Sequence, residues 1–437
     1  MRSLWPQGGL WGHRDFLKLW AGETISQFGS TIDDIAFPLV AILVLDASAF
    51  EVAALGTVLF LPFILFTLPA GVWVDRLPRR PILIVGDFGR AVLYATVPIA
   101  YVADVLTLWQ LYAVGFLVGV FQVFFDVAYQ SYLPSLVDRD QIIEGNSKFE
   151  ISRSAAQLSG PGLGGILVEI LTAPYAVLVD ALSFLASGVF ILGIRKPEEP
   201  PERATAADGT KTTFWAEVKE GLRFVLGNPN LRAQAGCTGT SNFFFSAGFA
   251  IVLVFFVREL GLSPGLIGVV FSVSAVGSMI AAFTATRIQR RFGIGPTTIA
   301  VTLLQGPAFL AIAFAPEGNA ALPILFASQL VIGFVLVTYN IIQVSYRQAI
   351  CPARLQGRMN SAMRFIVWGT IPLGTLAGGA LASWVGLRET IAIGALGSSL
   401  SFLWILLSPQ RHLRDMPEPV DDAPPAAAAA AAEPAPA

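Results

Sequence analysis

Long apolar runs follow one another along almost the whole chain, and short segments rich in arginine separate them. The stretch GVWVDRLPRR, residues 71–80, stands between the apolar runs FLPFILFTLPA and PILIVGDFGRAVLYATVPIAYVA. Only 13% of the residues are charged, against about 25% in soluble globular proteins, and 54% are hydrophobic. So few charges cannot cover a surface that faces water. The sequence therefore predicts a protein that crosses a membrane many times.

The apolar runs divide into twelve predicted membrane-spanning helices. A span needs about 20 to 25 residues, so a chain of 437 residues accommodates a dozen of them. The first run follows WGHRDF and is too long for the apolar core of a signal peptide, so we expect no cleaved leader. The predicted helices are 16–46, 50–74, 80–103, 107–132, 147–170, 174–194, 232–257, 264–286, 296–315, 321–346, 360–384 and 388–408.

The basic residues predict how these helices are oriented. With the amino terminus in the cytoplasm, 26 of the 28 lysines and arginines lie on the inner side, and only Arg258 and Arg388 lie on the outer side. Positive charge gathers on the cytoplasmic side of membrane proteins. We therefore expect a multi-pass protein of the cytoplasmic (inner) membrane with both termini in the cytoplasm.

The two halves of the chain repeat each other. Arg76, Arg79 and Arg80 return 211 residues later in AFTATRIQRR, where Thr286 stands in place of Asp75. QSYLPSLVDRDQIIEGNS also parallels VSYRQAICPARLQGRMNS at an offset of 214. A duplicated unit predicts an all-α membrane protein of two pseudo-symmetric six-helix halves with the substrate path between them. The expected parts are an N-terminal half at 1–194, a cytoplasmic linker with an amphipathic helix at 195–231, a C-terminal half at 232–408 and a disordered tail at 409–437.

Several of these stretches resemble the major facilitator superfamily of transporters. GVWVDRLPRR is similar to that family's loop of pattern GxxxDRxxRR between helices 2 and 3, although Pro78 replaces the usual glycine. SGPGLGGIL, residues 159–167, resembles the antiporter motif in helix 5 of drug exporters. DFLKLWAGETISQFGS, FFDVAYQSYLPSLV, DALSF and FWAEVKEGLRFVLGNP resemble the branch that holds the enterobactin exporter and macrolide efflux proteins. The resemblance implies the major facilitator fold and favours export.

The loop after helix 2 is interpreted as part of a cytoplasmic gate. A carboxylate inside a span is costly unless it is paired, and Arg79 or Arg80 could reach Asp126 in helix 4. At the offset of 214, Asp126 falls on Asn340, so the second half has lost both acids of the cluster. We expect the cluster to hold the cytoplasmic side shut in the outward-open state; independent loop charges are the alternative. Its expected members are Gly71, Asp75, Arg76, Arg79, Arg80 and Asp126.

Helix 1 carries acids inside the membrane. At 100° per residue, Glu23, Gln27, Ser30 and Asp34 lie within about 60° of one another, and Asp33 projects about 100° away. A charge at the bilayer centre costs about 2.5 kcal/mol or more, which favours a water-lined cavity. An acid in such a cavity can carry a proton near neutral pH. Asp34 is the first candidate for proton coupling or cation binding, and Asp33 or a purely structural role are the alternatives.

Arg153 and Gln157 lie one turn apart on one face of helix 5. Arg153 could face the cavity and bind an anion or an acid there. A simple pair with Glu150 or Asp126 near the inner surface is an equal alternative. The sequence alone therefore leaves the role of Arg153 open.

The helix 5 motif predicts a tight and bendable contact with a neighbouring helix. Its proline removes a helix hydrogen bond, and its glycines allow another helix to approach closely. Simple close packing would need the same residues and is the alternative. The residues concerned are Gly160, Pro161, Gly164 and Gly165.

Other chemically distinctive residues are expected to be structural. Asp87 and Arg90 are one turn apart in helix 3 and should pair locally. Asp180 belongs to DALSF, which recurs in the branch named above. Cys237 and Cys351 should be free thiols near a reducing cytoplasm, and neither histidine has ligand partners at metal-binding spacing.

These features together predict export of a bulky amphipathic compound, such as a drug, a macrolide-like antibiotic or a siderophore, in exchange for protons. We expect a monomer in the lipid bilayer, with a small-molecule substrate, no cofactor, no metal and no nucleic-acid partner. No GxxxxGK[ST] stretch for ATP and no nucleophile–base set for an enzyme is visible. The alternatives are an importer or lipid-moving transporter of the same fold, or a membrane sensor or scaffold. Aromatic residues that could line an apolar cavity are Phe37, Phe243, Phe244, Phe245, Phe249, Tyr339, Phe365 and Trp368.

Overall fold

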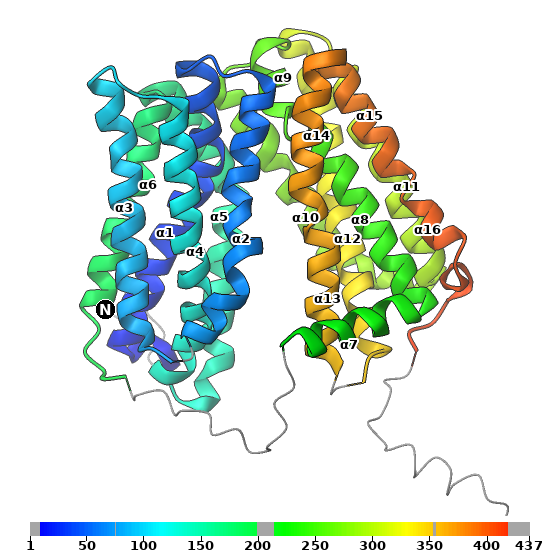
Figure 1. Ribbon diagram of the computed structural model, residues 1–437, viewed down its shortest axis with the longest axis horizontal. Helices are drawn as coiled ribbons and strands as arrows, with labels where there is room; N and C mark the ends of the chain where they lie inside the picture. The colour runs from blue at the N-terminus through cyan, green and yellow to red at the C-terminus, as the bar shows by residue number, and fades with distance from the viewer. Residues whose placement is uncertain (1–8, 75, 199–213, 353–354, 418–437) are drawn as a thin grey trace, which may run out of the picture.

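The first half of the chain folds into a bundle of six long helices. The structure, a computed structural model, describes residues 9–74, 76–198, 214–352 and 355–417. The described chain is almost entirely helical, and its two bundles stand side by side (Figure 1). The first bundle holds α1 (Arg14–Leu39), α2 (Ala49–Val74), α3 (Arg79–Val102), α4 (Leu108–Leu136), α5 (Ile142–Leu171) and α6 (Ala173–Leu192).

The second bundle is built from helices of which several are interrupted. α8 and α9, α13 and α14, and α15 and α16 are three such pairs, each forming one span with a short break. α7 lies across one end of this bundle and packs against α13 (Figure 1). The bounds are α7 (Phe214–Gly227), α8 (Pro229–Phe249), α9 (Val252–Arg258), α10 (Pro264–Phe292), α11 (Ile294–Ala313), α12 (Leu322–Ala349), α13 (Gln356–Trp368), α14 (Thr370–Val385), α15 (Leu387–Ser399) and α16 (Phe402–Leu406).

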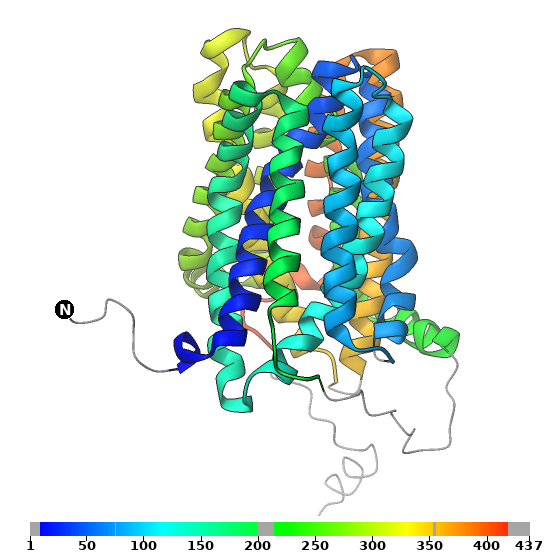
Figure 2. The same ribbon diagram turned by 90° about the vertical axis from the view of Figure 1, so that its left-hand side faces the viewer.

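The described chain contains eleven helical segments that are long and apolar enough to cross a membrane. α5 is the twelfth span by position, because it runs alongside the others in both views (Figures 1 and 2). Its 30 residues reach about 45 Å, but the charged and polar residues of its first half lower its hydropathy. The predicted fold class, an all-α membrane protein of two six-helix halves, is confirmed. Most of the tail predicted to be disordered lies outside the described residues.

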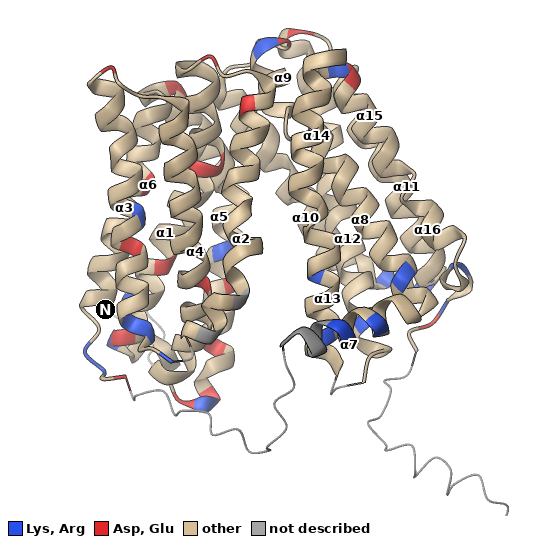
Figure 3. Ribbon diagram, in the orientation of Figure 1, with Lys and Arg blue, Asp and Glu red and all other residues tan. Residues whose placement is uncertain are grey.

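Lysine and arginine gather at one end of both bundles, the end that carries α7 (Figure 3). We call it the basic end, and the other the opposite end. Arg258 and Arg388, the two basic residues predicted for the outer side, stand at the opposite end. Each pairs with an acid there: Arg258 with Asp46 at 2.6 Å and Arg388 with Glu259 at 2.8 Å.

The two bundles meet toward the opposite end. α5 packs on α10, and α2 packs on α14. Glu169 at the end of α5 accepts hydrogen bonds from Ser263 Oγ at 3.0 Å and from the Gly265 amide at 2.8 Å, which caps the start of α10. Toward the basic end the bundles diverge (Figure 1). The conformation therefore closes the opposite end and separates the bundles at the basic end.

Candidate functional site

α1 presents its two adjacent acids to different surroundings. Gly29 and Asp33 face α6, and Thr31 faces Gly160 of α5. Asp34 projects away from both neighbours and is exposed, whereas Asp33 is only 6% exposed. Successive residues of a helix differ by about 100°, which explains the contrast. The structure thus separates the two candidates that the sequence placed side by side.

Asp33 belongs to a buried acidic pair that the sequence analysis missed. Asp180 of α6 is fully buried and lies against Gly29, one turn before Asp33 on the same face of α1. Ser183 Oγ donates to Asp180 Oδ1 at 2.8 Å, and Tyr94 of α3 is a neighbour of Asp33. One oxygen of each acid has no hydrogen-bond partner in the described chain. Unpaired acids inside a membrane protein often mark function, so Asp180 joins Asp33 and Asp34 as a candidate.

Glu23 and Gln27 form the other part of the α1 polar stripe. Gln27 Nε2 donates to Glu23 Oε1 at 2.8 Å, as their four-residue spacing allows. Glu23 is 7% exposed, and its second oxygen has no partner in the described chain. The stripe faces away from α5 and α6, because residues on the other sides of α1 contact those helices. The stripe therefore carries polar groups along the middle of α1, from Glu23 to Asp34.

Asp126 does not contact the loop arginines in this conformation, in which the bundles are apart at the basic end (Figure 1). Its Oδ1 accepts a hydrogen bond from Gln122 Nε2 at 2.7 Å, and Gln122 in turn accepts one from Arg90. Asp126 lies ten residues before the end of α4, which is about 15 Å from the basic end. In this conformation Arg90 is the arginine at the matching height.

The loop arginines have other partners at the basic end. The backbone amide of Arg79 donates to Glu198 Oε1 at 2.8 Å, and its Nη1 lies 3.5 Å from the same oxygen. Arg80 donates to two backbone carbonyls at the end of α6. Arg76 is exposed. Two members of the predicted gate remain: Gly71, which lies in α2, and Asp75, which lies outside the described residues.

The predicted local pair in α3 is confirmed and is deeply buried. Arg90 Nη2 lies 2.6 Å from Asp87 Oδ1, and the two side chains are 2% and 0% exposed. The guanidinium also lies over the rings of Phe125 and Phe184, at 4.3 and 4.0 Å from their centroids. Arg90 therefore joins α3 to α4 and α6 within the first bundle.

The α5 motif brings this helix against two others at once. Gly160 and Gly164 face α1, and Pro161 and Gly165 face α10 of the second bundle. A Cβ atom on Gly165 would lie 2.2 Å from the Pro264 carbonyl oxygen, so no side chain fits there. The structure thus has the tight contact that the motif predicts, and one side of it crosses between the bundles.

Arg153 and Gln157 precede Pro161 at four-residue steps along α5, and both are exposed. Arg153 Nη1 lies 4.0 Å from Glu150 Oε2, the limit of an ion pair, and the two side chains are 59% and 68% exposed. Of the two alternatives, this conformation has the pair with Glu150. The pair is loose enough to leave the guanidinium accessible.

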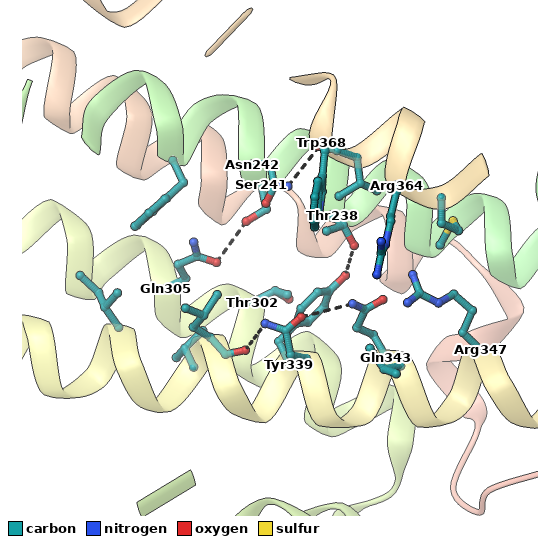
Figure 4. A pocket seen from close by; sticks show the side chains of 18 residues that line it. Thr238, Ser241, Asn242, Thr302, Gln305, Tyr339, Gln343, Arg347, Arg364 and Trp368 are labelled. Carbon is teal, nitrogen blue, oxygen red and sulfur yellow. Dashed lines mark hydrogen bonds between the residues drawn. The ribbon is translucent and has the colours of Figure 1, made fainter. Parts of the chain in front are cut away.

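The second bundle contains a cavity of about 380 Å³ between α8, α11, α12 and α13 (Figure 4). Hydroxyl and amide groups line part of it. The hydroxyls of Thr238 and Tyr339 lie 2.6 Å apart, and Ser241 Oγ donates to Gln305 Oε1 at 3.1 Å. Three of the aromatic residues proposed from the sequence line it: Phe245, Tyr339 and Trp368.

Two arginines also line this cavity, Arg347 from α12 and Arg364 from α13. From the sequence they were predicted only as basic residues of the inner side. A signal was present, because Tyr339, Gln343 and Arg347 follow at four-residue steps and share one face of α12. The stripe lines a cavity only because four helices pack around it, and the sequence pattern does not predict that packing.

Comparison with known proteins gives matches along almost the whole chain. The family described as Major Facilitator Superfamily matches residues 19–366 and 235–434. The multidrug efflux pump Tap of Mycolicibacterium fortuitum is 26% identical over 369 residues, which covers 83% of this chain and 88% of that protein. The uncharacterized MFS-type transporter YfiS of Bacillus subtilis is 25% identical over 381 residues, covering 85% and 88%.

Solved structures share the architecture. A bacterial homologue of the iron transporter ferroportin, in an inward-facing state, has a TM-score of 0.68 at 16% identity and covers 90% of this chain and 98% of that chain. The nucleoside transporter NupG has a TM-score of 0.72 at 13% identity, with the same coverage. At these identities the likeness shows the fold alone. With the family match over most of the sequence, the chain belongs to the major facilitator superfamily and is a multi-pass membrane transporter, not an enzyme.

Proposed function

We propose that this transporter exports a bulky amphipathic small molecule, such as a drug, a macrolide-like antibiotic or a siderophore, in exchange for protons. Positive charge marks the cytoplasmic side, so the basic end faces the cytoplasm, as do both termini, in the cytoplasmic membrane. The closed opposite end then corresponds to an inward-facing state, which receives its substrate from the cytoplasm. The multidrug efflux pumps Tap of Mycolicibacterium fortuitum and Mycobacterium tuberculosis, both 26% identical to this chain, support export.

The observation that carries proton coupling is the group of acids around Asp34. Asp34 is exposed, so it can exchange a proton with water. Asp33 and Asp180 are buried beside it, and no lysine or arginine of the described chain pairs with either. Neighbouring buried carboxylates repel each other unless one carries a proton. The proton gradient is thus the energy source, and the transporter works as a monomer without a cofactor.

A chain of helix contacts links these acids to the movement of the two bundles. Asp33 and Asp34 lie on α1, and α1 packs on Gly160 and Gly164 of α5. α5 in turn packs on α10 of the second bundle. A change of charge on α1 therefore acts on the helix that closes the opposite end. Protonation in one conformation and release in the other would couple the gradient to export.

Uptake into inside-out vesicles tests this proposal. The vesicles carry the wild type, Asp34→Asn or, as a matched control, Asp104→Asn, which removes an exposed acid from the loop after α3. An inward-acid pH gradient is imposed, and uptake of cationic dyes, macrolides and catecholate siderophores is followed with and without an uncoupler. We expect uncoupler-sensitive uptake by the wild type and Asp104→Asn that Asp34→Asn abolishes.

Two results would contradict the proposal at different points. Equal uptake by Asp34→Asn and wild type would remove Asp34 from the coupling mechanism, and Asp33→Asn and Asp180→Asn would then be compared. Absence of uptake for the whole panel, by wild-type protein that elutes as a folded species, would contradict export of these compound classes. Measurement of lipid distribution across the vesicle membrane would then test the lipid-moving alternative.

A further inference from the structure

The cavity of the second bundle is basic as well as aromatic. Arg347 and Arg364 line it, and no aspartate or glutamate is among the residues that do so. Within the described chain, neither arginine has an acidic side chain at salt-bridge distance. Arg347 Nε is buried and has no hydrogen-bond partner there. Arg347 is half-buried near the end of α12 and Arg364 is exposed toward the cavity, so both guanidinium groups can receive an anionic partner from outside the protein.

The two guanidinium groups come from different helices and converge on the same end of the cavity (Figure 4). Arg347 continues the stripe of Tyr339 and Gln343 along α12. Arg364 lies one turn before Trp368 on α13, with its guanidinium carbon 5.3 Å from the ring centroid. Guanidinium groups bind the paired oxygens of carboxylates and phosphates with two parallel hydrogen bonds. Two of them together fit an oxyanion.

The rest of the cavity fits a ring-bearing body. Aliphatic side chains of α12 form one wall, and aromatic rings of α8, α12 and α13 stand around it. Such walls hold flat apolar groups, and scattered amides and hydroxyls orient them. The residues of these walls are Phe245, Ile332, Val335, Leu336, Tyr339 and Trp368.

The two cavity arginines are not repeated in the first half. At the repeat offset of 214, Arg347 and Arg364 fall on Leu133 and Glu150 of the first half. The interior of the first bundle holds several buried acids, Asp33 and Asp180 among them, together with the paired Arg90. The duplicated halves have therefore diverged in charge at these two positions, and this arginine pair belongs to the second half.

We propose that this cavity binds an amphipathic organic acid, with its oxyanion on Arg347 and Arg364 and its ring between Phe245, Tyr339 and Trp368. This inference rests on the proposed export function and names the charge class of the substrate. The first bundle then handles protons, and the second bundle holds the anion.

Binding of three matched probes to the purified full chain in detergent tests the inference. Pyrenebutyrate, pyrenebutanamide and pyrenebutylamine share one ring and one spacer but are negative, neutral and positive. Fluorescence anisotropy gives the dissociation constant of each. We expect the acid to bind about tenfold or more tightly than the amide, because hydrogen bonds between charged groups are stronger than neutral ones. The amine should bind more weakly still.

Arginine variants then locate the effect. Arg347→Gln and Arg364→Gln should each remove most of the preference for the acid while leaving binding of the amide unchanged. Arg347→Lys and Arg364→Lys keep the charge but lose the forked geometry, so they should restore part of the preference. Arg287→Gln is the matched control, because Arg287 is an exposed arginine of α10 outside this cavity.

Equal affinity of the wild type for acid and amide would overturn the inference. A loss of acid preference in Arg287→Gln as large as in the cavity variants would also overturn it. Displacement of pyrenebutyrate by phosphatidylglycerol, but not by phosphatidylcholine, would assign the anion to a lipid headgroup and overturn the soluble acid. Failure of the anion-binding inference is distinguishable from failure of the export proposal. If vesicles take up cationic dyes but the purified chain does not prefer the acid, the export proposal stands and the anion-binding inference fails. If the purified chain prefers the acid but vesicles take up nothing, the anion-binding site stands and the export proposal fails.

Discussion

A single buried arginine joins three helices of the first bundle, which makes it a residue on which stability should depend. Arg90 is paired with Asp87, and both are almost completely buried. Arg90→Gln would leave the Asp87 carboxylate without its cation, and breaking a buried pair costs about 3 to 5 kcal/mol. We expect a clearly lower thermal unfolding temperature for the purified chain in detergent.

Two further variants separate this effect from simple loss of a charge. The double variant Asp87→Asn with Arg90→Gln removes both charges and should recover part of the lost stability. Arg153→Gln breaks the exposed pair with Glu150 and should cost at most about 1 kcal/mol. If Arg90→Gln shifted the unfolding temperature no more than Arg153→Gln, the structural role of Arg90 would be wrong.

At the scale of helices, the closed end depends on glycine contacts built twice. Gly165 of α5 meets α10, and at the offset of 214 Gly379 of α14 meets Ala53 of α2. In each case a Cβ atom would come within 2.6 Å of the other helix or closer. The duplication thus supplies both bundles with one helix that approaches the other bundle closely.

We expect Gly165→Ala to shift the transporter away from this conformation, because its methyl group would overlap the Pro264 carbonyl. Opening of the opposite end should bring the basic ends together. The readout is the distance between nitroxide labels at Ser147→Cys and Ser361→Cys, equivalent exposed positions in the two halves, measured by pulsed electron paramagnetic resonance. In Gly165→Ala, the fraction of molecules with a shorter distance between the two labels should increase.

Gly56→Ala is the matched control for this experiment. Gly56 also lies where the bundles meet, but a Cβ atom there would come no closer than 3.6 Å to Thr375. Both buried cysteines, Cys237 and Cys351, are replaced beforehand so that only the introduced thiols react. An unchanged distance distribution in Gly165→Ala, or the same change in Gly56→Ala, would count against the steric explanation.

At the scale of the whole molecule, charge pairs at the opposite end contribute to the balance between conformations. Arg258 of the second bundle lies 2.6 Å from Asp46 of the first, and the two side chains are 34% and 95% exposed. Exposed pairs contribute about 0.2 to 1 kcal/mol. Arg258→Asp should therefore reduce the population of this conformation by less than about fivefold, measured with the same label pair. Adding Asp46→Arg should restore it; a double variant that stays shifted would show that the pair itself is not responsible.

The gate predicted at the basic end concerns the same equilibrium between the two conformations of the transporter. In this conformation Arg79 and Arg80 bind Glu198 and the end of α6, and Asp126 binds Gln122. The bundles are apart at that end, so the structure contains the arginines with their partners in the open position (Figure 1). The predicted cluster was assigned to the outward-open state, so its contacts in that state stay a prediction.

The sequence by itself determined what depends on composition, period and repetition. Long apolar runs can only be spans, arginine marks one side of the membrane, and similar segments at a constant offset indicate duplication. Short-range geometry was equally accessible: the Asp87–Arg90 pair and the divergence of Asp33 from Asp34 follow from the turn of a helix. The residues in these two examples lie within about one helical turn of each other, so no information about helix packing was needed.

Only the tertiary structure decided which distant residues meet. The pairing of Asp33 with Asp180 depends on Gly29 bringing α6 close to α1, and the meeting of Arg347 with Arg364 depends on how α12 and α13 surround a cavity. A helix pattern gives the direction in which a side chain points, but not the neighbour in that direction or its height along the membrane. The neighbour and its height depend on how all twelve spans pack together, and no local stretch of sequence contains that information.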